Sequence, residues 1–179
     1  MFDRSQDIWN FATALYRQPG VEVLCLTLQQ RYQVNINLLM WCQWLQAQQL
    51  ALTPSLLNAA ETKLAGWDGA IVQPLRQVRQ ALKQQKTNDQ FAKLDTLYRN
   101  LKRVELDAER VEYGLLAELN LTKLSRAENL SVGHNLRCYL QFLHIEELES
   151  SWISTLSQLP FATANQIRRQ QSSEGNRES

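Results

Sequence analysis

The stretch that decides the fold is NLLMWCQWL, residues 37–45. Apolar side chains cover almost every side of a helix drawn through it, which is typical of a helix buried on all sides. Working outward from this stretch, we expect a domain in which other helices pack around a central one. The stretch carries no catalytic motif, so it indicates architecture and says little about chemistry.

The segments on either side repeat apolar residues every three or four positions, the spacing of amphipathic helices. This spacing runs through residues 8–15, 21–28, 56–64, 71–82, 94–115, 136–143 and 152–159. Pro19-Gly20 ends the first segment, and Thr53-Pro54 has the form of a capped helix start. We find no β-type alternation of convincing length. The sequence predicts an all-α, compact multi-helix bundle of about seven or eight helices.

The chain of 179 residues is long enough for one domain with its own core. After Ala164 the composition becomes polar, and Ile167 is the single large apolar residue. Such a segment buries too little surface to offset its ordering entropy. We predict a single helical domain over residues 1–163 and a disordered polar tail over residues 164–179.

The longest predicted helix opens after a capping-box spacing, Thr87 with Gln90, and is coiled-coil-like. Its apolar residues alternate three and four apart, as in a heptad seam: Leu94, Leu97, Leu101, Val104, Ala108, Val111 and Leu115. We expect a nearly parallel partner helix from the same chain, and a partner from another chain is the alternative. Leu106 and Tyr113 lie opposite the seam, so the helix is either sandwiched within the domain or contacts another protein.

Composition and charge place the chain among ordinary globular proteins. The net charge of +1 gives no global attraction to nucleic acid or to acidic membrane. Cys25, Cys42 and Cys138 are far apart and form no CxxC pair, which favours reduced thiols in a cytoplasmic protein. We find no apolar signal segment near the N-terminus, and the run around Met40 is too short to span a bilayer. We expect a cytoplasmic protein with no membrane partner.

Catalytic and metal-binding patterns are weak in this sequence. The acids of the long predicted helix invite a di-iron interpretation, which needs Glu-x-x-His units. His134 and His144 have no glutamate three residues before them. The sequence has no Gly-x-Ser-x-Gly elbow and no phosphate-binding glycine loop. We therefore expect no enzyme activity, no metal site and no cofactor.

The binding surface that the sequence singles out is a basic stripe. Its four cations are spaced three, four and three residues apart, and Trp67 lies at its margin: Arg76, Arg79, Lys83 and Lys86. One helix face with four cations suits phosphates, an acidic protein surface or a charged ligand. The alternatives are a solvated helix face and pairing within the fold, for which the acids at 146, 147 and 149 are candidates. Trp67 is either an anchor for a partner or a lid over the core.

The order of several short motifs resembles a proteobacterial family of unknown function, DUF2390. The resemblance rests on Trp9-Asn10-Phe11, Ala14-Leu15-Tyr16, Pro19-Gly20-Val21-Glu22, Val34-Asn35, Leu38-Leu39, Trp44-Leu45, Trp67 and Pro74-Leu75-Arg76 with Arg79. It covers the first half of the chain strongly, the long predicted helix loosely and the last third hardly at all. It implies a helical cytoplasmic protein and supplies no catalytic residues.

Together these patterns favour a non-catalytic cytoplasmic accessory protein that binds a macromolecular partner. We predict a protein partner held by the basic stripe (Arg76, Arg79, Lys83, Lys86) with Trp67. An RNA- or ribosome-associated factor is one alternative, and small-molecule binding between helices near Trp41 and Trp44 is another. The oligomeric state stays open at this point.

Overall fold

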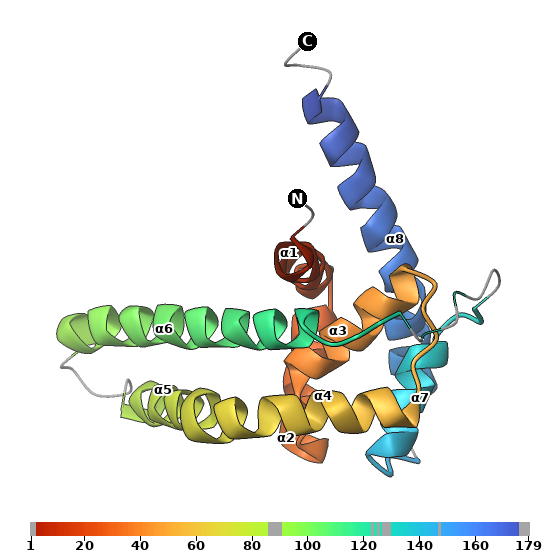
Figure 1. Cartoon of the computed structure of the whole chain (residues 1–179). Helices are drawn as coiled ribbons and strands as arrows, with labels where there is room; N and C mark the ends of the chain where they lie inside the picture. Colours follow the sequence, from red (N-terminus) through yellow and green to blue (C-terminus); the bar gives the residue numbers. More distant parts are fainter. Residues whose placement is uncertain are drawn as a thin grey trace.

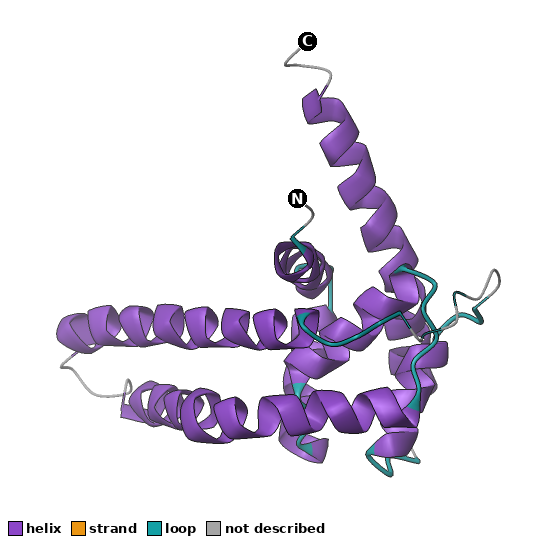
Figure 2. Ribbon diagram, in the orientation of Figure 1, coloured by secondary structure: helices purple, strands orange, loops and turns teal. Residues whose placement is uncertain are grey.

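The computed structural model describes residues 3–85, 91–122, 124, 126, 130–146 and 148–175. Its helices are α1 (Arg4–Tyr16), α2 (Val21–Tyr32), α3 (Ile36–Ala47), α4 (Pro54–Trp67), α5 (Gln73–Gln85), α6 (Phe91–Ala117), α7 (His134–Phe142) and α8 (Ser150–Gly175). A π-helical turn, η1 (Asp68–Val72), joins α4 to α5. Figure 2 shows helices and loops throughout the described part of the chain, so the predicted all-α fold is confirmed.

Helix α3 is the central element, as the opening stretch predicts. The Asn35 side chain caps it by accepting a hydrogen bond from the Leu38 amide at 3.0 Å. Every residue from Asn37 to Ala47 is buried. Helices α1, α6, α7 and α8 contact α3 from different sides. A helix that is apolar all round thus finds neighbours all round, which is the arrangement that minimises exposed apolar surface.

Asn135 fixes the loop that follows α3. Its Oδ1 accepts from the Leu52 amide at 2.9 Å, and its Nδ2 donates to the Leu50 carbonyl at 2.9 Å. Its own amide donates to Gln46 Oε1 at 3.0 Å. These bonds satisfy buried polar groups that a loop would otherwise leave unpaired.

The segment from α4 to α6 forms an antiparallel helical hairpin. Helix α4, η1 and α5 follow one another in nearly one line, and α6 runs back beside them. In Figure 1 the left-hand parts of α5 and α6 extend beyond the other helices. We call this projecting part, residues 71–85 and 91–111, the α5–α6 hairpin. It lies beside the core, so its outer faces have few neighbours.

The C-terminal part of the chain stays helical longer than its composition predicts. Helix α8 continues through Pro160 to Gly175, past the predicted start of the tail at 164. Ile167 packs against the core, and the Gln18 side chain donates to Gln166 Oε1 at 3.1 Å. These contacts, with the core and with the turn after α1, carry the packed face of α8 past Ala164 by about one turn. The rest of the predicted tail, residues 176–179, lies outside the described residues.

Within the described ranges, no helix combines the length and the apolar character that a bilayer span requires.

Candidate functional site

The two arginines of the predicted basic stripe point into the protein. Arg76 Nη2 lies 2.7 Å from Glu109 Oε1, and Arg76 Nε lies 3.4 Å from Glu105 Oε1. Arg79 Nη2 donates to Glu105 Oε1 at 3.0 Å, and Arg79 Nε pairs with Glu105 Oε2. Arg76 and Glu105 are only 9% and 5% exposed. We call these four residues the ion-pair cluster, and it ties α5 to α6.

The structure therefore does not place Arg76 and Arg79 on an exposed stripe with the two lysines. Arg76 and Arg79 lie on the helix face that packs on α6, where their charges neutralise Glu105 and Glu109. Lys83 is exposed near the end of α5, and Lys86 lies outside the described residues. A direct role of these residues in binding a partner stays a prediction, and the geometry gives the two arginines an internal role.

The acids that pair with these arginines were not predicted from the sequence. Pairing within the fold was an alternative there, but with the acids at 146, 147 and 149 and not with those of α6. A signal was present, because Glu105, Glu109 and Glu112 recur four and three residues apart on one face of α6. The cations of α5 recur at the same spacing of three and four residues, so the acidic row of α6 can face the basic row of α5.

Trp67 joins the same contact. Its indole Nε1 donates to the Ala108 carbonyl at 2.9 Å, and the side chain is partly buried. Ala108 itself is buried. Of the two alternatives for Trp67, the geometry favours the lid over the core, because the indole is bonded to α6.

A buried polar triad continues the ion-pair cluster toward the core. The Asn37 side-chain amide donates to Glu112 Oε2, and Tyr113 Oη donates to Asn37 Oδ1 at 3.0 Å. Burial raises the pKa of Glu112 to about 7, although the bond from Asn37 lowers it. Burial also raises the pKa of Glu109, with Arg76 opposing it. Tyr113 packs edge-on to Trp9, with ring centroids 5.8 Å apart. This triad holds α6 against α1 and α3.

One pair with nucleophilic potential occurs on α7. Cys138 Sγ lies 3.5 Å from His134 Nε2, one helical turn away. Burial raises the pKa of Cys138, which favours the less reactive thiol over the thiolate. The contact therefore resembles a packed thiol more than an activated nucleophile.

An apolar face covers one side of the α5–α6 hairpin. Four of its large side chains are exposed: Ile71 (37%), Val78 (52%), Leu97 (51%) and Val104 (50%). Four more are half-buried between them: Leu75, Leu82, Leu94 and Leu101. We call these eight residues the hairpin face. The seam of α6 was expected to be covered within the chain, and along this length it is only half covered.

Helical geometry places both rows of apolar residues on the same side of the hairpin. On α6 the exposed row lies about a quarter turn from Glu105, which faces α5. On α5 the half-buried Leu75 and Leu82 lie roughly 100–120° from Arg76, which faces α6, and the exposed Val78 lies roughly 160° from it, in the same rotational sense. Because the two helices are antiparallel, rotations in the same sense bring the rows to one side of the hairpin, with the α5 row turned further from α6. The hairpin face is therefore continuous across both helices.

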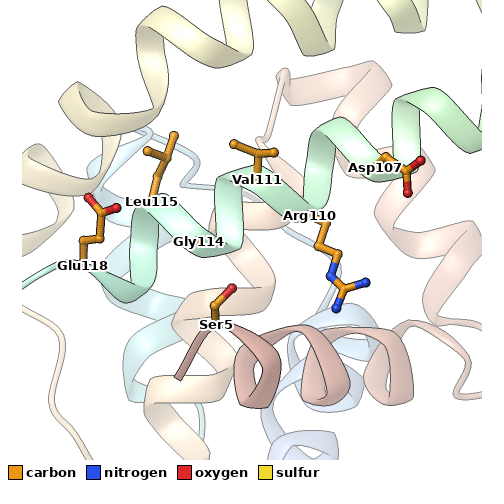
Figure 3. A pocket seen from close by; sticks show the side chains of 7 residues that line it. All are labelled: Ser5, Asp107, Arg110, Val111, Gly114, Leu115 and Glu118. Atoms are coloured by element: carbon orange, nitrogen blue, oxygen red, sulfur yellow. The ribbon is translucent and has the colours of Figure 1, made fainter. Parts of the chain in front are cut away.

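An open cleft of about 460 Å³ extends the hairpin face toward α1. It is lined by Ser5 of α1 and by Asp107, Arg110, Val111, Gly114, Leu115 and Glu118 of α6 or its end. Figure 3 shows Val111 and Leu115 pointing away from α1, whereas Arg110 points toward it. Val111 is 42% exposed and continues the spacing of Leu97 and Val104. The floor of the cleft is Gly114, which has no side chain to fill it.

The fold and this surface define an all-α bundle with a projecting helical hairpin, held by a buried ion-pair cluster and apolar on one side. The chain belongs to the DUF2390 family, described as a protein of unknown function, and the family model matches residues 7–116. The match runs from α1 to the end of α6 and includes the whole described hairpin. It confirms the resemblance inferred from the sequence motifs. No curated protein and no solved structure matches the chain.

Proposed function

We propose that this protein is a non-catalytic helical accessory protein that binds a protein partner through the hairpin face. The observation that carries the proposal is the grouping of exposed apolar side chains. Ile71, Val78, Leu97 and Val104 lie together on one side of a projecting element. Exposed apolar groups that gather in one patch are typical of protein–protein contacts, whereas scattered ones are ordinary.

The border of the hairpin face supports a protein partner over RNA. Four exposed residues that flank the apolar rows by helical position are uncharged: Pro74, Ala81, Gln85 and Asn100. The exposed Arg103 also borders the α6 row, and Asp107, one turn further along, carries the opposite charge. Nucleic acid binding depends on cations that neutralise phosphates. Arg76 and Arg79 are committed to Glu105 and Glu109 and so supply no such charge. An RNA- or ribosome-bound role is therefore the weaker proposal.

We propose the cytoplasm as the place of action. The three cysteines are free, Cys25 and Cys42 are buried, and burial raises the pKa of both thiols. Reduced thiols that form no bridge suit a reducing compartment.

Photo-cross-linking in the native cell tests the proposed function. A benzoylphenylalanine probe at Val104 would lie on the hairpin face, and a matched probe at Val23 would lie on α2, where valine is 70% exposed. We expect a light-dependent protein adduct from position 104 and none from position 23. An adduct that ribonuclease removes would support the RNA alternative. Equal labelling from both positions, or none from either, would contradict the proposal.

A further inference from the structure

We propose that the partner of the hairpin face is a second copy of this chain, bound with its α6 antiparallel to the first. This inference rests on the proposed function and names the partner at that same site. Isologous pairing needs a surface that complements itself. Three features of α6 meet this requirement.

The first feature is the spacing of the exposed seam. Leu97, Val104 and Val111 are seven residues apart and are all 42–51% exposed. A two-fold axis at Val104 places Val104 against Val104 of the second copy, and Leu97 against Val111 of the second copy. On α5 the same axis places Val78 near Leu82 of the second copy. Residues at heptad spacing keep facing one partner along its whole length, as in antiparallel helical bundles.

The second feature is the charge beside the seam. Arg103 and Asp107 are both exposed and border the seam on its outer side. In the antiparallel register Arg103 lies within one turn of Asp107 of the second copy. The two-fold axis creates the same pair again, between Asp107 and Arg103 of the second copy. Four further residues that border the face are uncharged: Pro74, Ala81, Gln85 and Asn100.

The third feature is Gly114. A glycine inside a helix lowers stability by about 1 kcal/mol relative to alanine. Packing within the chain does not require it, because a Cβ built there would meet only Ser5 Oγ, at an ordinary 3.8 Å. The antiparallel register places Leu97 of the second copy against Val111, one turn from Gly114, so the missing side chain leaves the cleft open beside that contact.

Sedimentation velocity of the purified full-length chain tests the inference. We expect concentration-dependent dimers of twice the 20.7 kDa chain mass for the unmodified protein and for the control Val23→Asp. Val104→Asp should weaken the dimer at least ~100-fold, because it buries two carboxylates at the axis. Circular dichroism would verify that each variant folds.

Charge variants keep the test independent of folding defects. Arg103→Asp and Asp107→Arg should each weaken the dimer by about 5- to 10-fold, and the double variant should restore it. A chain that stays monomeric at 100 µM, or dimers that Val104→Asp leaves unchanged, would overturn the inference. If the chain is monomeric but the Val104 probe still captures a different protein, the second copy is wrong and the proposed function stands. If neither a dimer nor an adduct forms, both fail.

Discussion

Arg76 and Lys83 lie on the same helix, seven residues apart, yet the structure predicts opposite consequences for their removal. Arg76→Ala leaves Glu105 and Glu109 with less positive charge in a buried site, and breaking such a pair costs about 3–5 kcal/mol. Lys83 is exposed, so Lys83→Ala should change the free energy of unfolding by less than about 0.5 kcal/mol. Urea denaturation of both variants measures the difference. Similar small losses for the two variants would show that the ion-pair cluster is not formed.

Glu112 predicts a pH dependence of stability that is unusual for a carboxylic acid. Its pKa is about 7 in the folded protein, above the ordinary value of 4.5, because burial disfavours the charged form. The folded state therefore binds the proton more tightly than the unfolded state. The stabilisation from this group is full below pH 4.5 and is lost as the pH rises through 7, by roughly 3 kcal/mol at most.

The variant Glu112→Gln isolates this effect, because the amide stays neutral at every pH. We expect the variant to be more stable than the unmodified protein at pH 8. Between pH 4.5 and 7 its free energy of unfolding should fall less steeply with pH, because the contribution of Glu112 is gone. Chemical denaturation at several pH values measures both. A variant that is less stable at pH 8 would indicate that the charged carboxylate is stabilising in the folded protein. Burial also raises the pKa of Glu109, so this group contributes a pH dependence of the same sign. Only the difference in the free energy of unfolding between Glu112→Gln and the unmodified protein therefore reports on Glu112.

Gly114 gives a prediction about α6 as an element. Gly114→Ala should stabilise the monomer by about 0.5–1 kcal/mol, because alanine favours the helix and meets no close atom. Gly114→Leu should leave the fold intact but fill the cleft and weaken dimers. Thermal unfolding of dilute protein and sedimentation at higher concentration separate these effects. A Gly114→Leu variant that dimerises as well as the Gly114→Ala variant would contradict the role given to the cleft.

At the scale of elements, the sequence predicted the helices well and their partners poorly. The apolar period located each helix of the core, and residues 37–45 lie at the centre as predicted. Period alone shows which residues share a face but not which face meets which neighbour. That is why Arg76 and Arg79 were predicted to bind a partner, whereas in the structure they pair with acids 26 to 33 residues further along the chain.

The α6 seam shows a second limit of the same kind. Its heptad spacing correctly indicated a nearly parallel partner helix, and α5 takes that place. The salt bridges, however, rotate α5 so that its own apolar row lies beside the seam and does not cover it. Leu106 and Tyr113 were expected to share one environment, but Tyr113 is buried and Leu106 is 48% exposed. Such rotations depend on tertiary contacts that a single sequence does not display.

The whole molecule consists of a body and a projecting hairpin. In the body, α1, α7, α8 and the C-terminal part of α6 pack around α3, and the buried residues of α2 belong to the same core. The α5–α6 hairpin carries the ion-pair cluster on its inner side and an apolar face on the other. Arg76 and Arg79 tie α5 to α6 and so restrain the hairpin. We propose that this restraint lowers the entropy lost when the proposed partner binds.

Disulfide cross-linking of single cysteine variants on a Cys138→Ser background tests directly whether two copies pair through the hairpin face in the antiparallel register. In the antiparallel register, Val104→Cys should form a covalent dimer readily. Leu97→Cys alone should not, because the two copies of residue 97 would lie about 21 Å apart along the helix. A mixture of Leu97→Cys and Val111→Cys should cross-link into a mixed dimer. A covalent dimer of Leu97→Cys alone that forms as fast as that of Val104→Cys, or no cross-link from any variant, would contradict the account.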